Sequence, residues 1–160
     1  MPSGRVISGL VGVLALLLLA PLAPAGASVE RTVSRSAASY GRAAFVTTNA
    51  QRVKYDRVRL GHHACLQRFA ARQAQRMATQ KKMFHQDLAP IQKACNVGWV
   101  GENVAMGYPS GRAVVRQGWM KSAGHRANIL NRKFRLMGLA ARKGANGYWY
   151  AAQVFGRKNG

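Results

Sequence analysis

The sequence predicts an α+β domain, and two of its segments carry that prediction. Residues 66–79 place apolar side chains at three- and four-residue spacing, which is typical of an amphipathic helix with one buried face. Residues 136–143 and 148–155 flank an Asn-Gly step in residues 144–147, which favours a hairpin between two strands. Because helices come before and between the antiparallel strands, we expect helices packed against a sheet.

The first and second helices are expected in the N-terminal half of the domain. Thr47 or Thr48 can cap a helix that runs to about Gly61. Its buried side is expected to contain Val46, Ala50, Val53 and Leu60. In the helix over residues 66–79, the apolar stripe predicts that Ala70, Ala74 and Met77 are buried.

A third helix is expected to begin near Ser110 and to end near Gly124, a suitable left-handed cap. It places Val115 and Trp119 one turn apart, and residues 125–131 fit a further short turn of helix. Residues 101–107 read as another strand. We therefore expect a three-stranded antiparallel sheet flanked by helices.

The N-terminal residues 1–27 have the layout of a signal peptide. Arg5 precedes an apolar run over residues 6–20, and small residues offer cleavage after Ala25 or Ala27. The alternative is a membrane anchor, but the run is shorter than the ~20 residues a spanning helix needs. We therefore expect a secreted protein, extracellular or associated with the cell wall.

The remaining chain is long enough for one domain. We expect a flexible linker over residues 28–44, where no helical or strand period persists, a domain over 45–157 and a tail over 158–160. The chain has two cysteines, Cys65 and Cys95. In an exported protein such an even pair most simply forms a disulfide.

Charge is strongly unbalanced, with 25 Lys and Arg against four acids and a formal net charge of +21. This charge predicts attraction to polyanions and says nothing about the fold. Glu102, the single glutamate of the expected domain, lies in a strand between Val100 and Val104. It is either buried, where it needs a hydrogen bond, an ion pair or a metal, or it points outward from an alternating strand.

The motifs of P-loop nucleotide binding, H-E-x-x-H zinc peptidases, G-x-S-x-G hydrolases, C-x-x-C redox proteins and Rossmann folds do not occur. The chain instead resembles the bacterial branch of the CAP superfamily of cysteine-rich secretory proteins, over about residues 48–156. The matching stretches occur in the family's order: Asn49-Ala50-Gln51-Arg52, the helix leading through Met77 to His85, Gly101-Glu102-Asn103-Val104-Ala105-Met106-Gly107, Trp119 to Leu130, Phe134, Gly138 and Gln153-Val154-Phe155-Gly156.

The resemblance implies an α-β-α sandwich with a cleft that in many members holds two His and two Glu, the His pair binding a divalent metal such as Zn²⁺. His85, Glu102 and His125 match three of these positions, so the three side chains are expected to converge, with ring nitrogens within ~5 Å of each other if both bind one ion. The second glutamate is absent, and Ser122 lies near its place. His62 and His63 are expected to be exposed and not ligands.

Three functions remain open at this point. The first is a secreted binding module that recognises an anionic cell-envelope polymer, a lipid or a membrane surface, its cleft either holding a metal or simply hydrogen-bonded. The second is a metal-dependent hydrolase with Glu102 as general base on a metal-bound water. Nucleic-acid binding ranks last because an exported chain meets little nucleic acid, and no obligate protein partner is evident.

Overall fold

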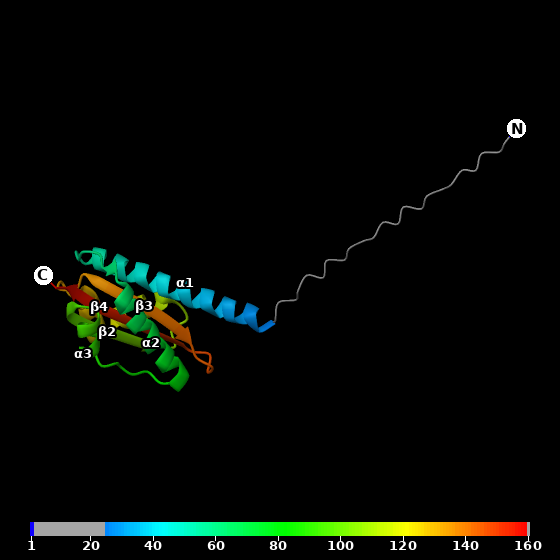
Figure 1. Ribbon diagram of the computed structural model, residues 1–160. Helices are drawn as coiled ribbons and strands as arrows, with labels where there is room; N and C mark the ends of the chain where they lie inside the picture. The colour runs from blue at the N-terminus through cyan, green and yellow to red at the C-terminus, as the bar shows by residue number, and fades with distance from the viewer. Residues whose placement is uncertain (2–24, 160) are drawn as a thin grey trace.

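The chain folds into three layers, with a sheet between two layers of helices (Figure 1). This computed structural model describes Met1 and residues 25–159, so residues 2–24 of the predicted signal peptide, with the apolar run 6–20, lie outside the described residues. The elements are α1 (Ala25–Lys54), β1 (Gly61–His62), α2 (Ala64–Gln80), α3 (Ala89–Ala94), β2 (Val97–Met106), α4 (Gly111–Ala113), the π-helix η1 (Val114–Gly118), the 3-10 helix η2 (Trp119–Lys121), α5 (Ala123–Leu130), β3 (Leu136–Lys143) and β4 (Trp149–Lys158). The predicted α+β sandwich is confirmed.

Within the described residues, no helix combines the length and apolar character needed to cross a membrane.

The sheet has the strand order β1-β3-β4-β2. β4 pairs antiparallel with both β3 and β2, and the predicted hairpin turn is formed, with Gly147 at a φ of 81°. The sheet has four strands, one more than the three expected. β1 adds a two-residue parallel strand beside β3, held by the bond from Gly61 N to Arg135 O (2.8 Å). A segment this short has no alternation that a sequence could reveal.

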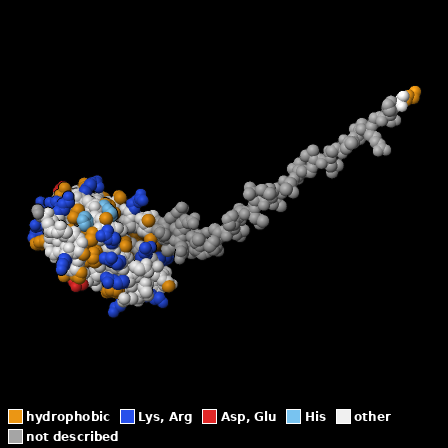
Figure 2. Space-filling model, viewed as in Figure 1, with side chains coloured by type: hydrophobic (Ala, Val, Ile, Leu, Met, Phe, Trp, Pro, Cys, Tyr) orange, Lys and Arg blue, Asp and Glu red, His pale blue; other side chains and the backbone are white. Residues whose placement is uncertain are grey.

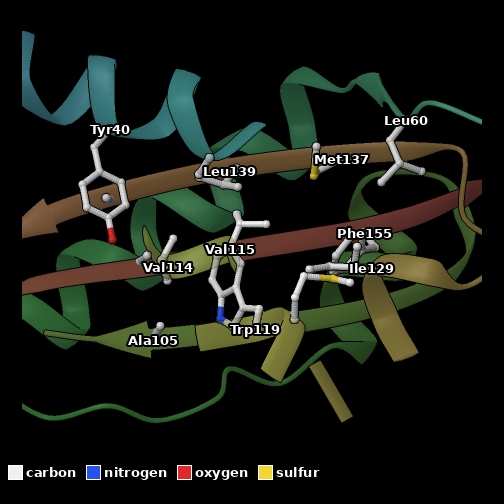
Figure 3. Close-up of a cluster of buried hydrophobic side chains, with 14 of the residues drawn as sticks. Tyr40, Leu60, Ala105, Val114, Val115, Trp119, Ile129, Met137, Leu139 and Phe155 are labelled. Carbon is white, nitrogen blue, oxygen red and sulfur yellow. The ribbon is translucent and has the colours of Figure 1, made fainter. Parts of the chain in front are cut away.

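Alternate residues of the strands face different helical layers, which produces two hydrophobic clusters. Met137 and Leu139 of β3 face the layer of α1, η1 and α5, where Trp119 is buried (Figure 3). Leu136 of β3 and Val154 of β4 face α2 and α3 on the other side. The period-two alternation of side chains along a strand explains this division.

Helix α1 corrects two predictions. Residues 28–44, expected as a flexible linker, belong to this helix, and Ala37, Tyr40 and Ala44 are buried. The helix also continues through Thr47 and Thr48 and ends at Lys54 instead of Gly61. The Ser-, Ala- and Arg-rich stretch has no strong period of its own, so its buried face is defined by the tertiary packing.

The buried face of the C-terminal half of α1 is the reverse of the expected one. Val46 and Val53 are exposed, whereas Thr48 and Arg52 are completely buried. Burial of these polar side chains is tolerated because each has hydrogen-bond partners in the interior. Leu60 is buried, as predicted.

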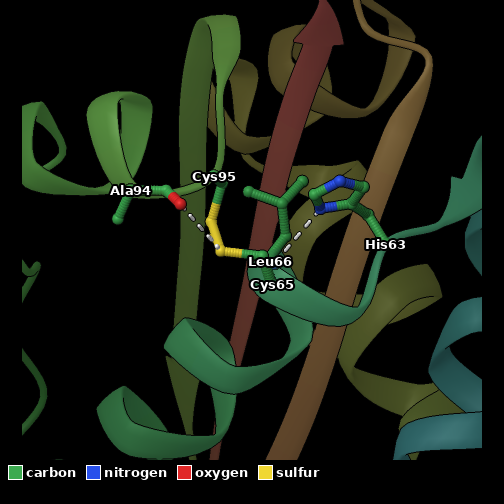
Figure 4. Close-up of a disulfide and its surroundings, with 5 residues drawn as sticks. All are labelled: His63, Cys65, Leu66, Ala94 and Cys95. Carbon is green, nitrogen blue, oxygen red and sulfur yellow. Dashed lines mark hydrogen bonds between the residues drawn. A yellow bond between two sulfur atoms is a disulfide. The ribbon is translucent and has the colours of Figure 1, made fainter.

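Helix α2 confirms the predicted amphipathic helix, with Ala70, Ala74 and Met77 buried. His63 occupies its N-cap position, where the ring accepts a bond from Leu66 N (3.4 Å). The predicted disulfide between Cys65 at the start of α2 and Cys95 after α3 is also present, with an S–S distance of 2.02 Å (Figure 4). It ties the two helices of this layer together.

The helix expected from Ser110 begins there, because the Ser110 hydroxyl accepts a bond from Ala113 N (3.2 Å). Val115 and Trp119 are buried, as their spacing suggested. The expected left-handed cap at Gly124 is wrong: the helix changes to π and then 3-10 geometry and ends at Lys121, and Gly124 lies inside α5. The π-helix gives way to the 3-10 helix at Gly118, where a Cβ would lie 2.6 Å from Tyr108 Cζ.

Candidate functional site

Glu102 of β2 is a buried carboxylate whose side chain is 1% exposed. Its Oε2 lies 2.8 Å from His85 Nδ1 and accepts a bond from Gln86 N (3.2 Å), while Oε1 accepts from Gln86 Nε2 (2.6 Å). Of the two alternatives for this residue, the structure shows the buried one. Three donors compensate for the loss of water around the carboxylate.

His85 lies on the segment after α2, and its side chain is 59% exposed. A neutral ring that donates its Nδ1 proton to Glu102 has a free lone pair on Nε2. Carboxylate–histidine pairs of this kind fix the tautomer and orientation of imidazoles that bind metals. The pair therefore leaves one oriented ring nitrogen directed away from the carboxylate.

His125 lies in the first half of α5 and is half-buried. Burial, and secondarily the charge of His85, lower its pKa below the usual value. The structure gives no direct hydrogen bond between the two rings. The spacing of the two rings expected for a shared ion stays a prediction.

A network of hydrogen-bonded Asn and Gln side chains connects the elements that carry the site. Asn128 of α5 donates to Glu102 O (3.1 Å) and to Asn103 Oδ1 (2.9 Å). Asn103 donates to His125 O and Gln153 Oε1 (both 3.1 Å), and Gln153 reaches Thr48 Oγ1 (2.9 Å). These bonds connect α5, which carries His125, to the strand that carries Glu102 and to α1.

Asn103, Asn128 and Gln153 lie in the stretches that match the family pattern, but the sequence assigns them no role. No pattern in the sequence marks Gln86, because its importance comes only from its contact with Glu102. Ser122 occupies the N-cap position of α5, and its hydroxyl makes no capping bond there. His62 is exposed and His63 caps α2, so neither joins this site.

The donor set fits a metal only in part. Within the described residues, no group of three or more His, Cys, Asp or Glu side chains is placed to hold an ion. His85 and His125 supply two imidazoles, whereas catalytic zinc usually has three protein ligands. Glu102 uses its oxygens to orient His85 and Gln86, so it acts as the partner of a ligand.

The α-β-α sandwich, with a histidine–glutamate pair where β2 meets the segment after α2, defines a domain of the cysteine-rich secretory type. The model of the family described as "Cysteine-rich secretory protein family" (CAP) matches residues 47–155. The chain belongs to this family. No curated protein sequence matches the chain.

Solved structures from several organisms share the fold. An extracellular protein of Bacillus anthracis with an SCP domain is similar at a TM-score of 0.67 and 25% identity, over 87% of this chain and 45% of that one. An outer surface protein of Borrelia burgdorferi aligns at a TM-score of 0.65 and 18% identity, over 72% and 90%. A venom allergen-like protein of Schistosoma mansoni aligns at 0.61 and 12%, over 75% and 89%.

Proposed function

We propose that this protein is a secreted binding module that recognises an anionic polymer of the cell envelope. One observation carries the proposal: among the side chains of residues 36–159, no Lys or Arg is paired with a carboxylate, and the ion pair that occurs there is that of His85 with Glu102. Lys and Arg side chains are spread over the face shown in Figure 2, with little acidic surface among them. A chain with 25 Lys and Arg and only four acids is expected to have a strong and salt-sensitive attraction to polyanions.

The proposed second determinant is the site of His85, Glu102 and His125. The bond from His85 Nδ1 to Glu102 leaves Nε2 for a ligand, and burial lowers the pKa of His125, which favours its neutral ring. Two neutral imidazoles could hold a divalent ion such as Zn²⁺, which would supply a positive centre for an oxygen of the ligand. The residues of this chain would bind the ion and fix the ring of His85.

The geometry argues against the hydrolase alternative. A general base needs a free carboxylate oxygen within hydrogen-bond reach of the attacking water. Both oxygens of Glu102 are already bonded to His85 and Gln86, and its side chain is buried. Support for a binding role is therefore stronger than support for catalysis.

The polymer proposal is tested by co-sedimentation with poly(glycerol phosphate) beads. We expect binding at low ionic strength that weakens steeply as salt rises, because association releases condensed counterions. Beads that carry an uncharged polysaccharide serve as the control. Equal retention on both beads, or retention that does not change with salt, would contradict the proposal.

The proposed binding of a metal by His85 and His125 is tested by calorimetry with Zn²⁺. We expect His85→Ala and His125→Ala each to abolish most of the affinity, since both rings bind one ion, whereas His62→Ala should have no effect. Glu102→Gln should weaken binding roughly 10–100-fold through loss of ring orientation. Affinity should also fall as the pH drops through about 6 to 6.5, where imidazole protonates. Equal Zn²⁺ affinity in the wild type and the double His variant would remove the metal from the proposal.

A further inference from the structure

A second cluster of charged side chains lies at the opposite end of α5 from His125. A cavity of about 140 Å³ is lined there by Arg52, Asp56, Arg57, Val58, Arg132 and Arg135, which we call the arginine pocket. Four arginines and one aspartate line this small space. Asp56 forms no ion pair with any of the four within the described residues.

Two of the arginines are anchored by backbone carbonyls. Arg52 donates to Val58 O (2.7 Å), Ile129 O (2.6 Å) and Asn131 O (3.0 Å). Arg57 donates through Nε to Leu130 O (3.0 Å) and through Nη1 to Tyr55 O and Asp56 O. The bonds to Ile129 O, Leu130 O and Asn131 O satisfy carbonyls at the end of α5, and the Nη2 group of Arg57 has no partner in the described part of the chain.

The other two arginines keep even more donors free. Arg135 uses Nη1 for the carbonyls of Arg132 and Phe134, so its Nε and Nη2 have no partner in the described part of the chain. The guanidinium of Arg132 has no recorded hydrogen bond there. Both side chains are exposed, so a ligand can reach them from solvent.

The positive charges in the pocket repel one another. Burial, followed by the charges of Arg135 and Arg57, lowers the pKa of Arg52 to about 10. Burial is the larger of these causes, and the like charges of Arg135 and Arg57 add to it. An anion bound among them would relieve this repulsion.

We infer that the arginine pocket binds a phosphate group. Three of the lining arginines, Arg57, Arg132 and Arg135, keep guanidinium donors without a partner in the described part of the chain. Several such donors suit a tetrahedral oxyanion with several acceptor oxygens better than a planar carboxylate with two. The cavity, at about 140 Å³, is small, so it suits a compact anion better than an extended ligand.

This inference rests on the proposed function for its natural ligand, which would be a phosphate ester of the envelope polymer. The same chemistry is offered by the headgroup of an anionic phospholipid. The pocket lies apart from the histidine site, so each can be tested alone. In this arrangement the wider cationic surface attracts the polymer, and the pocket holds one phosphate at a defined place.

The test compares two variants that lose the same charge. Arg132→Gln with Arg135→Gln removes two exposed cations of the pocket, and Arg68→Gln with Arg72→Gln removes two exposed cations from α2. Both variants should fold, which circular dichroism would verify. We expect the pocket variant to bind poly(glycerol phosphate) at least about tenfold more weakly than the wild type, and the α2 variant to lose clearly less.

A second measurement uses inorganic phosphate and NMR of the arginine Nε–Hε groups. Phosphate should shift the Arg57 and Arg135 signals saturably, and chloride at equal ionic strength should not.

Vesicles with phosphatidylglycerol, compared with phosphatidylcholine alone, separate a lipid headgroup from a polymer as the source of the phosphate. Equal loss of polymer binding in the two charge-matched variants, with no saturable shift, would overturn the pocket while leaving the proposed function intact. A saturable shift without any polymer binding would support the pocket and contradict the proposed function.

Discussion

Arg52 is a charged side chain that is fully buried without a carboxylate partner. Its guanidinium meets the carbonyls of Val58, Ile129 and Asn131, so it joins the end of α1 to the end of α5. The planar fork of arginine can serve several carbonyls at once, and hydrogen bonds from a charged donor are stronger than neutral ones. Arg52 thus holds the region that contains both α5 and the arginine pocket.

Replacement of Arg52 by lysine tests this role at the residue scale. A lysine side chain at this position would keep the charge but lose the fork, leaving two or more buried carbonyls without donors. We expect Arg52→Lys to lower the free energy of unfolding by about 3 kcal/mol in chemical denaturation. The exposed Arg68→Lys serves as the control and should change it by less than about 0.5 kcal/mol. Similar values for the two variants would show that the carbonyl contacts contribute little.

At the scale of elements, α2 lies unusually close to the sheet because β3 has a glycine beneath it. A Cβ at Gly138 would lie 2.1 Å from Gln67 N and 2.2 Å from Leu66 C, which are backbone atoms of α2. The Gln67 side chain then reaches Leu139, with Oε1 accepting from Leu139 N (2.8 Å) and Nε2 donating to Leu139 O (2.9 Å). The glycine therefore sets the contact between this helix and the sheet.

A single methyl group at this contact should separate the two elements. We expect Gly138→Ala to lower the free energy of unfolding by about 3 kcal/mol, measured by thermal and denaturant unfolding, because backbone must move. Gly124→Ala is a suitable control, since a Cβ there meets nothing within 4 Å. That change should stabilise the helix by up to about 1 kcal/mol. A neutral Gly138→Ala variant would mean that α2 can shift without cost.

At the scale of the whole molecule, the folded unit begins well before the segment that the family model matches. Tyr40 is buried, its ring lies 5.0 Å from that of Trp149, and its hydroxyl donates to Tyr108 O (3.2 Å). Burial is the main reason that the pKa of Tyr40 is raised. The N-terminal part of α1 is therefore a component of the core, in contact with the sheet and with α4.

Two truncations measure this contribution. A chain that begins at residue 35 retains the buried residues of α1, whereas one that begins at residue 45 loses Ala37, Tyr40 and Ala44. We expect the shorter chain to be less stable by on the order of 3–5 kcal/mol, the usual cost of deleting a large buried aromatic side chain. Equal melting temperatures for the two chains would restore the flexible-linker interpretation.

Part of the site could be predicted from the sequence and part could not. Glu102 stood out because a lone glutamate in an apolar strand needs a partner, and its contact with His85 agrees with the matching family positions. The bonds from Gln86 to Glu102 could not be predicted, because they form only when the segment after α2 packs against β2 and no sequence pattern marks this glutamine. The arginine pocket was equally hidden among 25 basic residues.

The sequence by itself determined the features that arise from local patterns: α2, the hairpin of β3 and β4, and the pairing of the two cysteines. A helical or strand period is a property of neighbouring residues, and two cysteines allow only one intramolecular bridge. Only the tertiary structure decided the length and buried face of α1, the short strand β1, and the partners of Arg52. Those features depend on residues far apart in the chain, such as Arg52 and Ile129, whose contact becomes favourable only when the packed layers exclude water and leave a carbonyl in need of a donor.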